Sequence, residues 1–135
     1  MKQIEAIIER ASDGTFAVYC KDEIFSGAGD TLEAAKEDMA QQMAFYKKTA
    51  QEEGFKYPDW LNEEYTVNYT VDMPSLMAYY VGNGVFTLAG LEKVTGISQK
   101  QLWSYLNGTK PRKTQQDRIA AGLQSLNQDI STIFS

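Results

Sequence analysis

The spacing of the apolar residues changes near residue 73, and this change limits the folds that the chain can adopt. Before it, the stretch YTVNYTV at residues 65–71 places Tyr or Val at every second position, the period of a strand with one buried face. Beyond it, apolar residues recur at every third or fourth position, the period of a helix with one buried face. The sequence therefore predicts an α+β chain of two domains, residues 1–73 with strands and one helix, and residues 74–135 with helices only.

Three strands are predicted ahead of the first helix. QIEAIIER, at residues 3–10, mixes apolar and acidic residues as a half-buried strand does, and FAVYC at residues 16–20 is rich in β-branched and aromatic residues. Asp13-Gly14 between them is a strong signal for the tight turn of a hairpin. A third, short strand is expected at about residues 23–26.

One long helix is predicted between the third strand and the strand at residues 65–71. Asp30 is the expected N-cap, Glu33 follows three residues later as in a capping box, and Gly54 is placed to end the helix. The order β-β-β-α-β predicts a small sheet with one helix on a face. The residues expected on the inward face of the helix are Leu32, Ala35, Met39, Met43, Tyr46 and Ala50.

Three features of this half could suggest ligand sites but are better explained as structure. SGAGDT, at residues 26–31, lacks the lysine and the spacing of a P-loop, so a tight strand-to-helix connection is expected there. Cys20 is expected to be a small core residue of its strand. No metal site is predicted, because solvated strand and helix faces account for the acidic residues Glu5, Glu9, Asp13, Asp30, Glu33 and Asp38.

The composition restricts the chemistry of the chain. Its 135 residues include no histidine, which excludes Ser-His and Cys-His nucleophile pairs and His-containing zinc sites. The single cysteine excludes an internal disulfide and suits a reducing cytosol. No apolar run approaches the ~20 residues of a membrane span, and the first ten residues carry charges that a secretory signal lacks. We expect a cytoplasmic protein that is not an enzyme and has no cofactor.

Four helices are predicted in the second half. Pro74 suits the start of the first, and the glycines of GNG at residues 82–84 are expected to end it. Thr87 is the expected N-cap of the second, Ser98 that of the third, and Thr114 that of the fourth. Gly96 supplies the sharp turn between the second and third helices, and Gly108 is expected to end the third. The fourth helix carries the apolar residues Ile119, Leu123, Leu126, Ile130 and Ile133.

The third helix of this half has the polar surface that a DNA-reading helix needs. Leu102, Tyr105 and Leu106 are expected to face inward. The pattern does not decide whether Trp103 lies in the core or at the surface. Gln and Lys side chains bond base edges in the major groove, and basic loops bind phosphates. The alternative is a helical packing domain with a polar face. The residues predicted to bind DNA are Thr87, Ser98, Gln99, Lys100, Gln101, Trp103, Ser104, Lys110, Arg112 and Lys113.

The charge is divided unevenly between the halves. Residues 1–84 hold 15 acidic and 7 basic side chains, and residues 85–135 hold 3 acidic and 6 basic ones, giving −8 and +3 within a total of −5. Such asymmetry indicates separate partners. We expect the basic half to bind double-stranded DNA and the acidic half to bind a basic protein.

The first half resembles the HicB antitoxin family. The resemblance covers about residues 3–45, through AIIERASDGTFAVY and GAGDTLEAAKEDM, and YTVNYT continues it. It implies a partial RNase H-like β-β-β-α-β domain without a nuclease site. It also implies binding to a small, basic ribonuclease toxin of the HicA type.

The second half resembles an XRE-type (lambda-repressor-like) helix-turn-helix over about residues 74–130. TGIS, the inward Leu102 and YLNGTKPR carry the resemblance, whereas Glu92 stands where that motif usually has a small residue. Together the two resemblances imply the antitoxin of a type II toxin-antitoxin pair that neutralises its toxin and represses its own operon as a homodimer or higher homo-oligomer. The alternative is a stand-alone transcription regulator whose first domain senses a ligand or dimerises.

Overall fold

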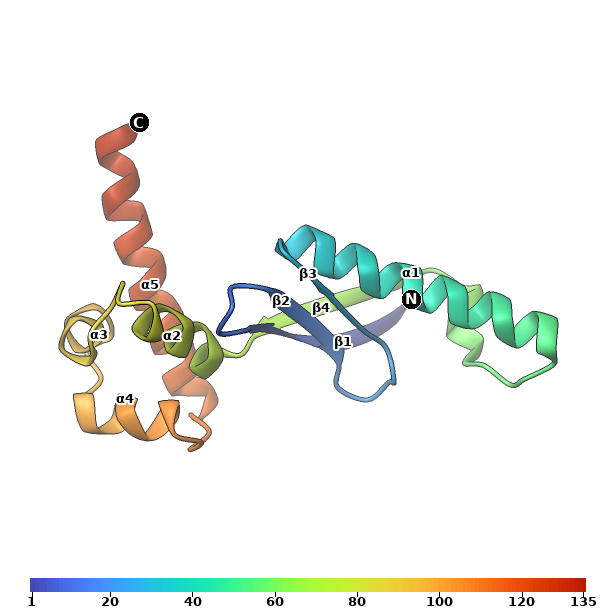
Figure 1. The fold of residues 1–135 in the computed structure, drawn as a ribbon, viewed down its shortest axis with the longest axis horizontal. Coiled ribbons are helices and arrows are strands. Elements are labelled where there is room, and N and C mark those ends of the chain that lie inside the picture. The colour runs from blue at the N-terminus through green and yellow to red at the C-terminus, as the bar shows by residue number, and fades with distance from the viewer. The chain divides into compact units, whose positions relative to one another are not determined.

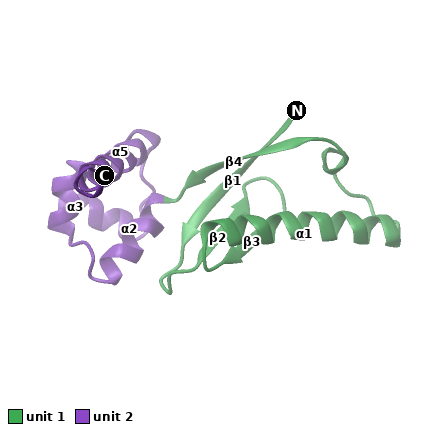
Figure 2. Cartoon of the chain, turned by 90° about the horizontal axis from the view of Figure 1, so that it is seen from above, with its two compact units in different colours: residues 1–72 green, residues 73–135 purple.

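The computed structural model describes residues 1–135, which form two compact units, residues 1–72 and residues 73–135 (Figure 2). The division falls one residue before the boundary expected from the sequence. The chain is α+β, with one four-stranded mixed sheet in unit 1 and five α-helices, one in unit 1 and four in unit 2 (Figure 1).

Unit 1 has the predicted order β-β-β-α-β. Its strands are β1 (Lys2–Arg10), β2 (Phe16–Cys20), β3 (Ser26–Gly29) and β4 (Tyr65–Val71), which lie side by side in the order β3-β2-β1-β4. The β1–β2 and β2–β3 pairs are antiparallel, whereas β4 runs parallel to β1. A parallel neighbour needs a long crossover, which α1 and the following loop provide.

The hairpin between β1 and β2 turns where the sequence predicts. Gly14 has a positive φ of 93°, and Asp13 Oδ1 accepts hydrogen bonds from the backbone N and the hydroxyl of Thr15 at 2.9 and 2.7 Å. These bonds stabilise the charged carboxylate and lower the pKa of Asp13 below its ordinary value.

The predicted position of the third strand is wrong, because the strand comprises residues 26–29 rather than 23–26. SGAG is the strand itself and not a connection to the helix. The physical reason is close packing on α1: a Cβ on Gly27 would lie 2.4 Å from both Ala35 O and Met39 N, so only glycine allows the helix to lie this near.

Helix α1 (Leu32–Glu53) covers one face of the sheet, as predicted (Figure 2). Its N-cap is Thr31 and not Asp30: Thr31 Oγ1 accepts a hydrogen bond from Ala34 N at 3.0 Å. Gly54 ends the helix with a φ of 77°, and the 3-10 helix η1 (Asp59–Asn62) follows. The inward face of α1 is confirmed by the buried side chains Ala35, Met39, Met43 and Ala50 and by the partly buried Leu32 and Tyr46.

The core of unit 1 lies between α1 and the sheet. Trp60 of η1 makes edge-to-face contacts with Phe25 and Tyr65 at ring-centroid distances of 6.0 and 5.0 Å. Cys20 is buried in this core, as expected, and burial raises the pKa of its thiol.

Unit 2 contains α2 (Met73–Gly82), α3 (Leu88–Thr95), α4 (Gln99–Leu106) and α5 (Lys113–Phe134). One predicted boundary is wrong. Arg112, not Thr114, is the N-cap residue of α5, and it makes no side-chain cap. α4 ends as expected, with Asn107 as its C-cap residue and Gly108 next to it at a φ of 109°. The buried core consists of Met77, Leu91, Ile97, Leu102, Tyr105 and Ile119.

None of the helices combines the length and the apolar character that crossing a membrane requires.

Candidate nucleic-acid interface

The α3–α4 pair is built from three local signals that the sequence places correctly. Thr87 Oγ1 accepts a hydrogen bond from Gly90 N at 3.0 Å and so caps α3. Gly96 takes a φ of 73° at the end of α3, a conformation that costs glycine least. Ser98 Oγ accepts from Gln101 N at 3.2 Å and caps α4. The hydroxyls of Thr87 and Ser98 are therefore already engaged in capping the two helices.

The turn between α3 and α4 is held from two further sides. Glu92 Oε2 accepts a hydrogen bond from Gln99 N at 3.2 Å, and Arg118 of α5 donates to Gly96 O at 3.0 Å. From the sequence, Glu92 was only a departure from a motif, and no role was predicted for Arg118. The structure shows that the carboxylate occupies the N-terminus of α4, where a negative charge is favourable.

The outer face of α4 is polar and accessible. Gln99, Lys100 and Gln101 are exposed, and Trp103 is 58% exposed, so this tryptophan is a surface residue and not a core residue. Tyr105 is only 4% exposed and belongs to the core, as expected.

Two side chains of this face already have partners on α4. Gln101 Nε2 donates to the hydroxyl of Tyr105 at 3.0 Å, which leaves the Gln101 carbonyl oxygen and one N–H for other contacts. The half-buried Ser104 donates its hydroxyl to Gln101 O at 2.8 Å. Gln99 and Lys100 are therefore the better placed to contact a ligand from the first turn of α4.

A hollow of about 470 Å³ lies between α4 and the start of α5. It brings together three of the residues predicted to bind DNA, Gln101, Lys110 and Arg112. Lys113 is also exposed, and its ion pair with Asp117, at 3.1 Å, is a surface pair that contributes little to stability. Since α5 has no side-chain cap, its first N–H groups add to the positive end of the helix dipole here. The lining residues that sequence reasoning missed are Tyr105, Thr109, Thr114 and Gln115.

Unit 1 has a second candidate surface on the sheet face opposite α1. No helix of unit 1 covers this face, and its two charged strand side chains, Glu5 and Glu9, are both acidic. Tyr19 donates its hydroxyl to Glu9 Oε1 at 2.9 Å, and Asn68 donates to Glu5 Oε1 at 3.2 Å. Desolvation and the neighbouring Glu9 raise the pKa of Tyr19 to about 12. We call this surface the open sheet face; its side chains include Gln3, Glu5, Ile7, Glu9, Tyr19 and Asn68.

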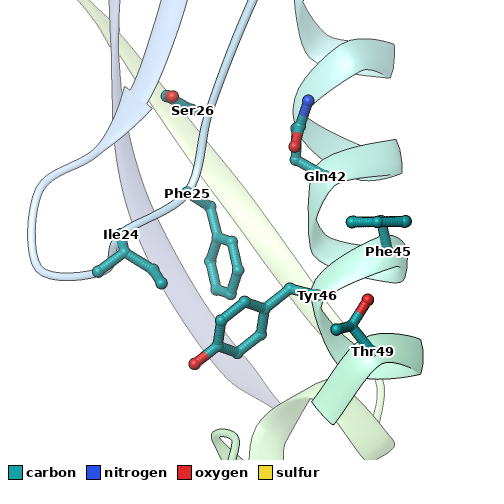
Figure 3. A pocket seen from close by; sticks show the side chains of 7 residues that line it. All are labelled: Ile24, Phe25, Ser26, Gln42, Phe45, Tyr46 and Thr49. Atoms are coloured by element: carbon teal, nitrogen blue, oxygen red, sulfur yellow. The ribbon is translucent and has the colours of Figure 1, made fainter. Parts of the chain in front are cut away.

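A hollow of about 410 Å³ lies at the other side of unit 1, between α1 and the β2–β3 segment (Figure 3). The rings of Phe25 and Tyr46 meet there edge to face at 5.4 Å, while Ile24 and Phe45 are 75% and 69% exposed. The hollow has no charged lining residue. It offers apolar contact but no carboxylate, thiol or imidazole that could act as an acid, a base or a metal ligand.

No cluster of three or more His, Cys, Asp or Glu side chains that could hold a metal ion is present in the chain. No protein-family model, curated protein or solved structure matches the chain.

Proposed function

We propose that the protein is the antitoxin of a HicAB-like type II toxin-antitoxin pair, with a DNA-binding helix-turn-helix in unit 2 and a toxin-binding surface in unit 1. One observation carries this proposal. On a chain with a net charge of −5, the exposed residues Gln99 and Lys100 of α4 directly precede Gln101, which lines one hollow together with Lys110 and Arg112.

In this proposal α4 is the recognition helix and enters the major groove of an operator. Gln99 and Lys100 contact base edges from its first turn, as recognition helices do with their N-terminal residues. The N-terminus of α4 does not contact a phosphate, because Glu92 already accepts the hydrogen bond of Gln99 N. Phosphate contacts come instead from Lys110, Arg112 and Lys113 and from the uncapped start of α5.

The proposed toxin-binding surface is the open sheet face. A ribonuclease toxin needs basic residues to hold RNA phosphates, so an acidic surface can cover the same residues and exclude the substrate. Residues 1–72 hold 15 acidic and 7 basic side chains, and Glu5 and Glu9 both project from β1, one of the two middle strands of the sheet. The resemblance of residues 3–45 to the HicB family supports the same partner.

The DNA-binding part is tested by titrating the protein with the DNA upstream of its own gene. We expect a palindromic site with half-sites about 10 bp, or a multiple, apart. Gln99→Ala should relax the preference at one or two base pairs, at a cost of roughly 1–3 kcal/mol. Arg112→Ala and Lys113→Ala should weaken binding to all sequences alike and reduce the salt dependence by about one unit each.

The exposed Trp103 allows DNA binding to α4 to be followed by tryptophan fluorescence. In a Trp60→Phe background, Trp103 is the single tryptophan, and its fluorescence should change when DNA covers α4. In the reciprocal Trp103→Phe variant, the remaining Trp60 of unit 1 should give no change. Unaltered fluorescence of Trp103 at saturating operator, or no protection of the promoter, would contradict the placement of the recognition helix.

The toxin-binding part is tested by co-expressing the full chain with a short, basic open reading frame next to its gene and scoring growth. Glu5→Lys with Glu9→Lys should abolish rescue, because both changes place positive charge on the open sheet face. A matched control is Glu52→Lys with Glu53→Lys, which changes the net charge equally at the exposed end of α1. Rescue by the first variant would refute this surface, and absence of any such neighbouring gene would favour a stand-alone regulator.

A further inference from the structure

Trp103 is a large hydrophobic side chain on the otherwise polar outer face of α4. It is 58% exposed, and from residue 86 to residue 129 it is the single large hydrophobic side chain that is exposed. The neighbours that share its face of α4 are the exposed residues Gln99, Lys100 and Asn107. An exposed indole forgoes the free energy that burial in the core would bring, so packing within unit 2 does not explain this residue.

The packing of α4 fixes the direction in which Trp103 points. Leu102 is fully buried and Tyr105 is 4% exposed, so these two side chains hold the far side of the helix in the core. At the end of α4, the backbone O of Trp103 accepts hydrogen bonds from Asn107 N at 3.1 Å and from Asn107 Nδ2 at 2.8 Å. Trp103 therefore lies on a turn of helix whose rotation and backbone are both held in place.

We propose that Trp103 contacts a thymine methyl group in the major groove and so determines part of the operator sequence. This inference rests on the proposed function, in which α4 is the recognition helix. The C5-methyl of thymine is the one methyl group on the major-groove edges of the four bases, and apolar side chains recognise it by contact. A single apolar side chain among polar ones matches such an edge. A protein partner would instead need a continuous apolar patch, which α4 does not carry.

The position of Trp103 on α4 indicates which base pair it meets. A helix rises 1.5 Å per residue, so Trp103 lies about 6 Å beyond Gln99 along the axis, or about two base-pair steps of B-DNA. Helical side chains lean toward the N-terminus, which brings the indole back toward the first turn and shortens this offset. In each half-site, the thymine should therefore lie about one or two base pairs from the pair that Gln99 contacts.

The test replaces each thymine of the footprinted operator in turn with deoxyuridine, which keeps the hydrogen-bonding edge and removes the methyl group. For the wild-type chain we expect one thymine per half-site at which uracil weakens binding about fourfold, as expected for one buried methyl group. With uracil in both half-sites the loss should be about 16-fold. Trp103→Ala should bind the thymine and uracil operators equally well, and both more weakly than the wild type binds the thymine operator.

Two further variants separate a methyl contact from a general weakening of binding. Gln99→Ala should bind both operators more weakly but keep the ratio between them, because it leaves Trp103 in place. Trp103→Phe should retain part of the ratio, since a phenyl ring also contacts a thymine methyl group. Both residues are exposed, so none of these changes should unfold unit 2, which circular dichroism verifies.

The outcomes distinguish this inference from the proposed function. A uracil effect that persists in Trp103→Ala would overturn the inference, because it would then come from the DNA itself or from another residue. Equal binding of both operators by the wild type, or wild-type affinity in Trp103→Ala, would also overturn it while leaving α4 as the recognition helix. Absence of any specific DNA binding by the wild type would instead contradict the proposed function and this inference with it.

Discussion

Gly122 is the position at which one added methyl group should most damage the proposed DNA-binding unit. It lies in the middle of α5, where the helix passes α3. A Cβ at residue 122 would lie 2.4 Å from Val94 O, 3.0 Å from Val94 C and 3.1 Å from Thr95 Cα. All three atoms belong to the backbone, so no change of side-chain rotamer can relieve the contact.

The magnitude of the Gly122→Ala effect follows from two opposing contributions. Alanine is favoured over glycine in a helix interior by about 1 kcal/mol. Against this, α3 must move away from α5 by about 1 Å, and overpacking of this kind typically costs 1–3 kcal/mol or more. Because the obstacle is backbone, we expect the upper end of that range and a net loss of about 2 kcal/mol. For a unit of this size such a loss lowers Tm by roughly 8–16 °C.

The two tryptophans provide a separate reporter for each unit, since Trp60 lies in unit 1 and Trp103 in unit 2. Urea unfolding followed by their two indole N–H signals in NMR spectra should show an earlier transition for Trp103 in Gly122→Ala and an unchanged one for Trp60. Gly82→Ala is the matched control, because a Cβ there meets no atom within 4 Å. A Gly122→Ala protein as stable as the wild type would refute the close packing of α3 on α5.

Two further predictions concern unit 1. Gly27→Ala should destabilise the sheet by about 2 kcal/mol or more, since its Cβ would lie 2.4 Å from Ala35 O and Met39 N. The Trp60 indole signal should then be lost at a lower urea concentration than in the wild type, while the transition of Trp103 is unchanged. Equal Trp60 midpoints for Gly27→Ala and the wild type would disprove the tight β3–α1 packing. Tyr19 has a folded pKa of about 12, raised from 10, so the stability that its neutral form contributes is complete below pH 10 and is lost as the pH rises toward 12. Tyr19→Phe should therefore reduce the loss of unit 1 stability between pH 10 and 12, measured by urea denaturation at a series of pH values. A pH profile identical to that of the wild type would contradict the burial of the Tyr19 hydroxyl. Tyr69, whose pKa is also raised by burial, accounts for part of the slope that remains.

Most elements of the fold could be predicted from the sequence, because each depends on a local pattern. The alternation at residues 65–71 forms β4, the three-and-four spacing from residue 32 to residue 50 forms the buried face of α1, and Asp13-Gly14 forms the hairpin turn. Thr87, Gly96 and Ser98 behave as predicted for the same reason, since a cap or a positive φ is decided within three or four residues. In the candidate site, the exposure of Gln99, Lys100 and Gln101 follows from the helical period.

The other features of the fold and of the candidate site depend on contacts between residues distant in the chain, which no local sequence pattern predicts. Gly27 and Gly29 are typical of a loop in sequence, but they belong to the third strand. They are glycines because α1 lies too close to this strand to leave room for a Cβ. Glu92 caps a helix seven residues away, and Arg118 reaches the turn at Gly96 from another helix. The helical period predicted that Leu102 and Tyr105 face inward, but only the packing showed that Trp103 lies at the surface. The sequence alone determined the order of the helices and strands and the charge of each half, because local periods, caps and composition fix these. Only the tertiary structure decided the position of β3, the contacts at the α3–α4 turn and which sheet face is left uncovered, because these depend on residues distant in the chain.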